Sequence, residues 1–252
     1  MRKPRRPGQI KLWAIAAWLL IWQLCAMLIG QQLLLVSPVT ALLRLGTLAC
    51  TGSFWLSVTY SLLRICAGFL AACLLGVLLA TLSSKYRLIE QFLAPFMITV
   101  KAVPVACFVI LILIWVSSVN LSIIISFLMV LPIVYTNTKK GITACDVQLL
   151  EMAQVFRIPF PRRLRAIYLP QISPYFQAAC SVSIGLCWKA GIAAEVIGLP
   201  RHSIGANLYN AKIYLDTPDL FAWTIAIICI SLLCEKLFLW LLKIASTRLQ
   251  RS

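Results

Sequence analysis

Charged side chains are scarce in this sequence, and acidic ones are the scarcest. Asp, Glu, Lys and Arg make up 12% of the 252 residues, against about 25% in an ordinary soluble domain. Hydrophobic residues make up 62%, an excess that a water-soluble domain of this size could not bury. The sequence therefore predicts an all-α polytopic membrane protein, in which residues 12–252 form a single transmembrane domain with no soluble domain appended.

Motifs that support catalysis or bind cofactors are also missing. No Gly-x-x-x-x-Gly-Lys-Ser/Thr run is present to bind nucleotide phosphates, and no Ser/His/Asp arrangement lies in a loop that could hold it. The single histidine, His202, cannot build a metal site, and the ten cysteines form no Cys-x-x-Cys pair. We therefore expect no catalytic residue, no metal site and no bound cofactor in this chain.

Positive charge, by contrast, is in excess, and the formal net charge is +16. The basic residues cluster at the ends of apolar runs, as in membrane proteins, and residues 1–11 form a basic tail. No basic helix or aromatic-rich patch stands free of the apolar runs. Nucleic acid is therefore not an expected partner, and the lipid bilayer is.

The apolar runs predict six transmembrane helices, since a span needs about 20 apolar residues. The first run is long for a signal peptide and lacks a small-residue cleavage site, so we interpret it as an uncleaved span. Pro104 interrupts the third run, and Pro132 lies inside the fourth. The runs cover about residues 12–35, 55–82, 91–117, 119–138, a stretch that begins at Ser173-Pro174, and 217–244, where Thr217-Pro218 is expected to cap the helix.

The distribution of Lys and Arg predicts how these spans are oriented. Most of these residues lie in the N-terminus, the second-to-third loop, the fourth-to-fifth loop and the C-terminus. The loops on the opposite side hold only Arg44, Arg201 and Lys212. Because loops rich in Lys and Arg stay in the cytoplasm, both termini are expected there.

The fourth-to-fifth loop, residues 138–173, is long and polar, and loops of this length inside a compact domain are usually functional. Asp146 is suited to cap a helix over residues 147–157. This helix places apolar residues on one face, which suits a lipid surface or a groove on a partner.

Prolines divide the rest of this loop. Pro159 and Pro161 are expected to end the first helix. A second helix is expected over residues 162–168, stopping before Pro170. The loop is therefore predicted to hold two short helices with a break between them.

One run in this loop has a distinctive spacing, with no insertion, of five residues: Glu151, Ala153, Ile167, Leu169 and Pro170. With this spacing it resembles the E-A-A-x-x-x-G-x(9)-I-x-L-P segment of permease subunits from ATP-binding-cassette importers. Met152 and Arg157 stand where the family has Ala and Gly. Weaker similarities at residues 57–69, 101–104 and 194–198 favour the nitrate/sulfonate/taurine-type permeases. The resemblance implies a type I ABC importer (MetI-like) permease fold.

The resemblance implies a role for residues 145–170. In the family this segment forms the coupling helix, which sits in a cleft of a cytoplasmic ATPase and transmits its closure to the spans. ATP and Mg²⁺ would be bound by that ATPase. Because Arg157 replaces the glycine at which the chain turns, we expect Pro159 and Pro161 to supply the break, and Arg157 to reach acidic groups of the ATPase. The residues implied in docking are Glu151, Ala153, Arg157, Ile167, Leu169 and Pro170.

The resemblance also implies an assembly in the bacterial inner membrane. The permease would act as a homodimer or with a paired permease, and each subunit would dock one ATPase. An extracytoplasmic solute-binding protein would deliver the solute. The chain itself would be a transport subunit and not an enzyme.

Three charged residues inside the spans are candidates for the solute pathway: Lys101, Lys189 and Glu195. A charge in lipid is costly, so such residues usually face the bundle interior or a wet cavity. The lysines would make the pathway attractive to anions. In the structural alternative, Lys101 and Arg64 contact backbone carbonyls or snorkel to the membrane surface, and Glu195 is a counter-ion. Lys189 and Glu195 are six residues apart and do not share a helix face.

These features favour a small organic or inorganic anion, such as a sulfonate, nitrate or taurine, as the substrate. A neutral vitamin precursor is the alternative within the same importer type. A secondary transporter would need inverted repeats and an acidic site for its coupling ion. A receptor or scaffold would carry an appended interaction domain, and the sequence shows neither set of features.

Overall fold

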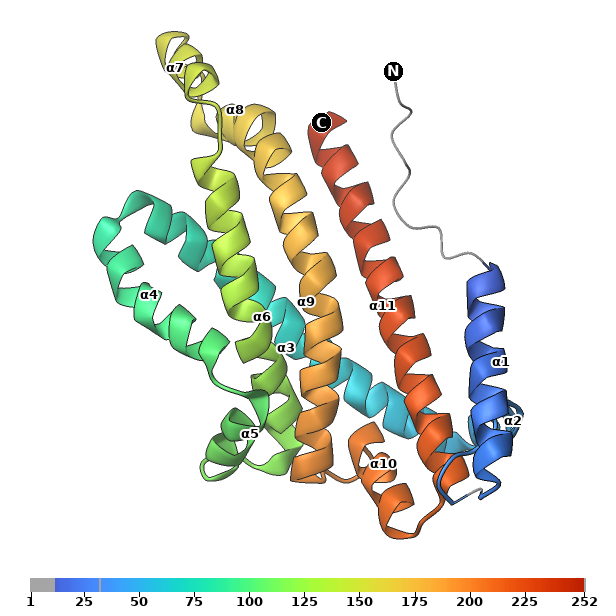
Figure 1. Cartoon of the computed structure of the whole chain (residues 1–252). Helices are drawn as coiled ribbons and strands as arrows, with labels where there is room; N and C mark the ends of the chain where they lie inside the picture. The colour runs from blue at the N-terminus through green and yellow to red at the C-terminus, as the bar shows by residue number, and fades with distance from the viewer. Residues whose placement is uncertain (1–11, 32, 252) are drawn as a thin grey trace.

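The computed structural model describes residues 12–31 and 33–251, and all regular structure in this part of the chain is helical. Figure 1 shows long helices side by side, with α7 and α8 at one end of the bundle and α5 and α10 at the other. In chain order the elements are α1 (Leu12–Ile29), α2 (Pro38–Ala49), α3 (Gly52–Lys85), α4 (Arg87–Ala102), α5 (Val105–Leu113), α6 (Ser118–Thr143), α7 (Val147–Val155), α8 (Phe160–Arg163), the π-helical turn η1 (Leu164–Tyr168), α9 (Leu169–Gly198), α10 (Ile204–Ile213) and α11 (Thr217–Arg251).

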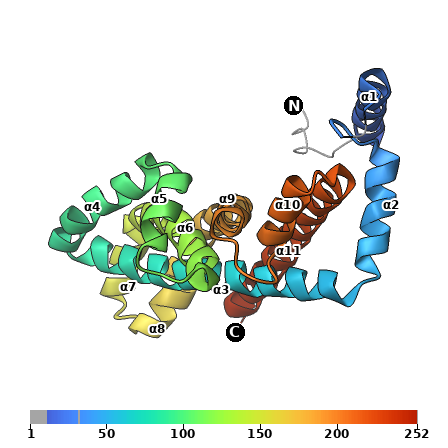
Figure 2. The ribbon, with the colours of Figure 1, turned by 90° about the horizontal axis from the view of Figure 1, so that it is seen from below.

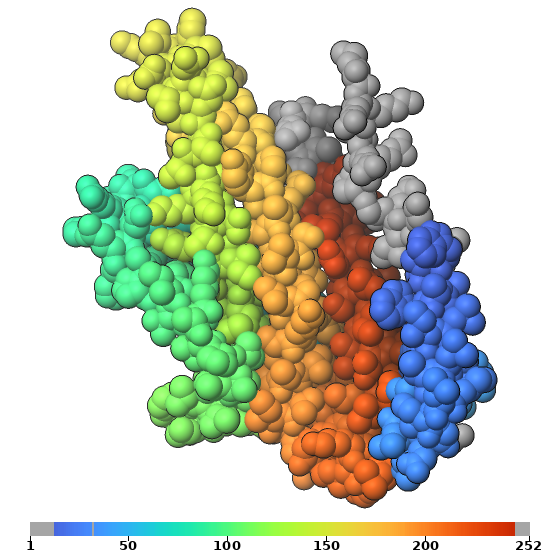
Figure 3. All heavy atoms as spheres, in the orientation of Figure 1, coloured from blue at the N-terminus to red at the C-terminus, as the bar shows by residue number. Residues whose placement is uncertain are grey.

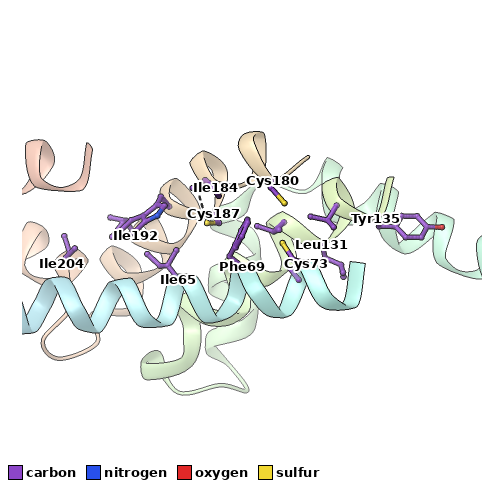
Figure 4. Packing of buried hydrophobic residues seen from close by; sticks show 14 of the residues in the cluster. Ile65, Phe69, Cys73, Leu131, Tyr135, Cys180, Ile184, Cys187, Ile192 and Ile204 are labelled. Atoms are coloured by element: carbon purple, nitrogen blue, oxygen red, sulfur yellow. Dashed lines mark hydrogen bonds between the residues drawn. The ribbon is translucent and has the colours of Figure 1, made fainter. Parts of the chain in front are cut away.

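Helices α3, α6 and α9 form the centre of the bundle, where α6 packs along both of the others. Lipid tails are as apolar as the side chains, so association of helices in a membrane depends on close van der Waals packing. Figure 4 shows Phe69 and Cys73 of α3 facing Cys180 and Cys187 of α9, with Leu131 of α6 beside them. The buried face of α3 is otherwise made largely of small residues: Ser57, Ser61, Gly68, Ala72, Gly76, Ala80 and Ser83.

Gly68 marks the place where α3 comes nearest to α6. A Cβ atom at this position would overlap the backbone oxygen of Ile123 and lie 3.0 Å from the Cβ of Ser126. Neither neighbour is the flexible end of a side chain, so the two helices would have to separate. The close packing of α3 against α6 therefore requires short side chains on α3.

The remaining helices surround this centre. Helix α11 packs against α9, α10 and α2, and α1 lies at the edge of the molecule beyond α2 (Figure 2). Arg44 of α2 pairs with Asp219 and with Asp216, the latter at 3.9 Å. Asp216 also accepts a hydrogen bond from the Asp219 amide at 3.2 Å. The cap of α11 therefore lies one residue before the expected Thr217.

The six predicted spans are not all confirmed in the described residues. Four helices are long and apolar enough to cross a membrane: α3, α6, the continuous helix Phe160–Gly198, and Thr217–Ile244 of α11. The first run was expected to stay helical to about residue 35, but α1 ends at Ile29. Gly30 adopts a left-handed φ of 64°, the conformation at which helices commonly stop.

The third run is not one straight span. Helices α4 and α5 meet at an angle of 105°, and counting this bent pair as one crossing gives five. The bend lies at Pro104, where Val103 takes an extended ψ of 131°. Proline has no N–H for the helix ladder and excludes the helical conformation from the residue before it, so the predicted interruption becomes a sharp corner.

The predicted stop before Pro170 and the fresh start at Ser173-Pro174 are both wrong. The helix runs without a break from Phe160 to Gly198, and Pro174 lies inside it. Pro170 follows directly after the π-helical turn η1, in which the Leu169 amide bonds to the Leu164 carbonyl. A π turn is wider than an α turn, so a proline ring that follows it need not end the helix.

Substitution of Gly68 tests how strictly α3 and α6 depend on close approach. We expect Gly68→Ala to lower the free energy of unfolding by about 1–3 kcal/mol, because the added methyl group overpacks the interface. Gly46→Ala is the control, since nothing lies within 4 Å of a Cβ there and alanine favours a helix. Thermal unfolding of the purified variants in detergent measures both effects; equal midpoints for the two variants would contradict the expectation.

Candidate functional site

The docking segment, residues 145–170, connects α6 to α9 and projects from one end of the bundle. Figure 3 shows it standing clear of the neighbouring helices at the upper edge of the molecule. The end of α11 lies at the same end of the bundle (Figure 1). The segment is therefore accessible to a partner that approaches along the long axis of the bundle.

The start of the docking segment is fixed by two hydrogen bonds. The Asp146 carboxylate accepts from the Gln148 amide at 2.8 Å, which confirms the predicted N-cap of α7. The Asp146 amide in turn donates to the side-chain oxygen of Gln171 at 2.8 Å. Because Gln171 belongs to α9, this contact holds the first turn of α7 against the base of that long helix.

Arg157 makes the turn at the end of α7. Its φ of 48° is left-handed, the conformation that a glycine at this position would adopt most easily. Its amide bonds to the Gln154 carbonyl at 3.1 Å, and the Ile158 amide bonds to the Ala153 carbonyl at 2.9 Å. These two bonds form a Schellman motif. The expectation that Pro159 and Pro161 replace the missing glycine is therefore wrong, because Arg157 itself takes the glycine conformation.

The predicted docking residues divide by exposure. Ala153 and Ile167 are buried, Leu169 and Pro170 are partly buried, and Glu151 and Arg157 are exposed. The buried pair is not accessible to a partner, whereas the exposed pair is. The segment also exposes an apolar surface that sequence reasoning had only partly anticipated, formed by Val147, Leu149, Met152, Val155, Phe156, Phe160 and Leu164.

A second feature is a hollow between α4, α6 and α9. It has a volume of about 500 Å³, and we name it the lysine hollow. Lys101 and Lys189 both line it, although they come from helices far apart in the sequence, while no carboxylate of the described residues does. The remaining lining is Val100, Ala102, Val103, Pro104, Val105, Met129, Pro132, Ile133, Leu186, Ala190 and Ala193.

The corner at Pro104 helps to open the lysine hollow. The 105° bend turns α5 away from the line of α4. The residues of the corner, Val103 and Pro104, form part of the wall of the hollow. The proline thus shapes the place where the two lysines meet.

The intramembrane cations differ in their contacts. Arg64 donates to the Val119 carbonyl and to the Asn120 side chain at 3.1 Å, and its guanidinium lies 4.3 Å from the centre of the Tyr60 ring. This agrees with the structural alternative for Arg64. The Thr136 hydroxyl, at 3.5 Å, is the hydrogen-bond partner of Lys101 among the described residues. Lys101 is exposed and lines the hollow.

Glu195 lies elsewhere, fully buried where α9 meets α3 and α10. Its Oε2 accepts from the Ser61 hydroxyl at 2.7 Å and from the Gly205 amide at 3.2 Å. The Ser61 oxygen also accepts from the Ile204 amide at 3.0 Å. Glu195 does not line the lysine hollow, so the structure separates it from Lys101 and Lys189.

Gly205 allows this contact, since a Cβ there would overlap Glu195 and lie 2.6 Å from the Val196 amide nitrogen. The carboxylate thus sits at the first turn of α10, where the backbone amides have no carbonyl partner within the helix and the helix dipole favours negative charge. Sequence reasoning singled out neither Ser61 nor Gly205 as a partner of Glu195. The available signal was weak: a glycine ten residues after an intramembrane Glu, at the start of a short helix.

Comparison with known proteins gives relatives along most of the chain. It is 27% identical over 227 residues to the putative aliphatic sulfonates transport permease protein SsuC of Bacillus subtilis, covering 88% of this chain and 82% of that protein. It is 26% identical to the bicarbonate transport system permease protein CmpB of Synechococcus elongatus, covering 75% of this chain and 68% of the relative. The nitrate import permease protein NrtB of the same species is 24% identical, covering 71% and 68%.

A protein-family model described as the binding-protein-dependent transport system inner membrane component matches residues 72–251. This range begins within α3 and includes the docking segment, both lysines of the hollow and Glu195. The match confirms the resemblance recognised in residues 151–170 and makes the chain a transport component of the inner membrane rather than an enzyme. The chain belongs to the binding-protein-dependent inner-membrane components, the permease family of ATP-binding-cassette importers.

Proposed function

We propose that this chain forms the membrane path of an ATP-driven importer for small anions and docks its ATPase through residues 145–170. The observation that carries the anion assignment is the lysine hollow, in which Lys101 and Lys189 meet with no carboxylate in the lining. Two ammonium groups in a largely apolar hollow attract negative charge more strongly than the same groups would in water. Relatives named for sulfonate, bicarbonate and nitrate transport support the same class of solute.

The exposed surface of the docking segment supports its assignment as the ATPase contact. Large apolar side chains such as Val155 and Phe156, which are 78% and 72% exposed, are costly to leave in water. Glu151 and Arg157 lie on the same segment and are exposed as well. An apolar helix face with charges at its margin is the pattern with which a helix enters a groove on a partner.

The assembly follows from membership of the family, which associates with an ATPase and a solute-binding protein. We propose that ATP and Mg²⁺ bind to the ATPase and that this chain pairs with a second permease subunit, either a copy of itself or a related chain. Residues 12–252 would form one permease domain, with residues 1–11 and the C-terminus in the cytoplasm. The position of the α11 end beside the docking segment supports this orientation for the C-terminus.

The proposed mechanism uses α9 as the link between docking and transport. The helix from Phe160 to Gly198 begins in the docking segment, passes the lysine hollow at Lys189 and ends beyond Glu195. When the ATPase pair closes, movement of the docking segment would carry this helix with it. The lysine hollow would then open alternately to the two sides of the membrane.

Docking depends on the turn at Arg157, and substitutions there separate conformation from charge. We expect Arg157→Asn to retain ATPase binding largely, because asparagine tolerates left-handed φ while removing the charge. Arg157→Val should lose most of the binding, because a β-branched residue does not adopt that conformation readily. Co-purification of the permease with its ATPase measures both, and Arg157→Gly is the control that restores the family residue.

The outcome distinguishes two roles of Arg157. Equal loss in the Asn and Val variants would show that the charge matters and the turn does not. Hydrogen exchange at the Ile158 amide, which is bonded to the Ala153 carbonyl, reports the turn independently of the ATPase. Fast exchange should therefore accompany weak docking in Arg157→Val alone.

The lysine hollow predicts that charge at Lys189 is required for transport. We expect Lys189→Met to lower ATP-coupled anion uptake in proteoliposomes by tenfold or more. A tenfold loss corresponds to on the order of 1.4 kcal/mol in the affinity of the anion for the lysine hollow. Co-purification with the ATPase should be unchanged, because Lys189 lies far along α9 from the docking segment. Lys236→Met is the matched control, an exposed intramembrane lysine outside the hollow. Wild-type uptake by Lys189→Met would remove this residue from the path.

A further inference from the structure

A second hollow lies beside the first, between α4 and α6. Its volume is about 430 Å³, and we name it the Glu90 hollow. Lys101 lines both hollows, so the two meet at this residue. Besides Glu90 and Lys101, the lining of the Glu90 hollow is formed by Ala94, Met97, Ile98, Tyr135, Thr136, Lys139, Lys140 and Thr143.

The Glu90 hollow lies nearer to the docking segment than the lysine hollow does. Helix α6 contributes residues 129–133 to the lysine hollow and residues 135–143 to the Glu90 hollow. At 1.5 Å per residue the centres of these two stretches are about 12 Å apart along the helix. Thr143 is the last residue of α6 before the docking segment. A solute leaving the lysine hollow toward that end would pass the Glu90 hollow next.

The charges of the Glu90 hollow do not balance. Three lysines, Lys101, Lys139 and Lys140, line it with a single carboxylate, Glu90. That carboxylate forms an ion pair with Lys139. Within the part of the chain that the structure describes, Lys101 has only the Thr136 hydroxyl and Lys140 has no ion pair. Two positive charges, both on exposed side chains, therefore lack a counter-charge in a concave place, and a cleft lined by one sign of charge attracts counter-ions.

We propose that the Glu90 hollow is a second anion-binding site, which takes the transported anion as it leaves the lysine hollow. Glu90 competes with that anion for Lys139, and so limits how tightly the site holds its ligand. This inference rests on the proposed function for the identity of the anion, while the site itself rests on the charges of the hollow. A path needs such a limit, since an anion held too firmly near the exit would not be released.

Lys101 connects the two hollows of the proposed path, because it lines both. A lysine ammonium is a compact charge on a flexible four-carbon stem, so it can follow an anion from one hollow to the other. The Thr136 hydroxyl, 3.5 Å from the Lys101 nitrogen, lines the Glu90 hollow and holds the ammonium near the junction. Removing Lys101 should therefore affect both sites, whereas Lys140 and Lys189 each belong to one.

The chemistry recognised by the Glu90 hollow is a small oxyanion, and a phosphate of an anionic lipid headgroup shares it. The connection to the lysine hollow through Lys101 favours the free anion, because a lipid headgroup has no path to follow there. The experiment must separate these two sources. Methanesulfonate serves as the free-anion probe, and phosphatidylglycerol serves as the lipid.

Binding is measured on the full chain in nanodiscs of phosphatidylcholine, from the methyl NMR signal of methanesulfonate at low ionic strength. We expect two binding events in the wild type, of which Lys140→Met should weaken the one at the Glu90 hollow about tenfold and leave the other unchanged. Glu90→Gln should tighten the same event severalfold, because it frees Lys139. Lys212→Met, which removes a lysine outside both hollows, is the control and should match the wild type.

The results decide between the alternatives. Affinities unchanged within twofold in both Lys140→Met and Glu90→Gln would overturn the site, even if Lys189→Met abolishes uptake as expected. Loss of methanesulfonate binding when phosphatidylglycerol is added, with this lipid co-purifying only when Lys139 and Lys140 are present, would assign the hollow to lipid and also overturn it. Persistent binding that depends on Glu90 and Lys140, in a protein that imports no anion with its ATPase, would retain the site and reject the transport role.

Discussion

The arrangement of this protein depends on the contact at which α9 meets α3 and α10 around the carboxylate of Glu195. A membrane gives little hydrophobic force for bringing helices together, so approach must be close enough for dispersion and hydrogen bonding to hold them. Gly205 permits that approach, and the Ser61 hydroxyl and the Gly205 amide donate to Oε2 of the buried carboxylate, whereas Oε1 has no hydrogen-bond partner among the described residues. With one end of α9 fixed in this way, the positions of Lys189 and of the docking segment follow from its length.

The continuity of α9 has a mechanical consequence. A helix of 39 residues extends about 60 Å, and α-helices bend but do not stretch appreciably. Its two ends therefore move as one body unless a weak point lies between them. The π-helical turn over Leu164–Tyr168 is such a point, because its hydrogen-bond ladder is locally displaced. It lies beside the docking segment and far from Glu195, so the stretch Leu169–Gly198, which carries both Lys189 and Glu195, is joined to the docking segment at this turn.

The sequence predicted those features that depend on local chemistry. The cap at Asp146, the interruption at Pro104 and the spacing from Glu151 to Pro170 were all visible in a few adjacent residues. The left-handed turn at Arg157 was not, because arginine gives no sign of a conformation that the surrounding hydrogen bonds impose. The continuation of the helix through Pro170 and Pro174 was not predicted either. Helix propensity treats proline as the end of a helix, and a preceding π turn is not visible in the sequence. The meeting of Lys101 with Lys189 and the separation of Glu195 from both depend on how helices pack, which no local pattern encodes.

Arginine and lysine occupy different parts of this molecule. The docking segment carries arginines at 157, 162, 163 and 165, whereas the two hollows carry lysines at 101, 139, 140 and 189. Arginine presents a rigid planar fork of donors, which suits a fixed contact between two protein surfaces. Lysine presents a small charge with freely rotating donors, which attracts an anion without demanding one shape and releases it as easily. Lysines along the proposed path would therefore attract anions without selecting among them, and discrimination between anions would fall to a step before the solute enters the membrane.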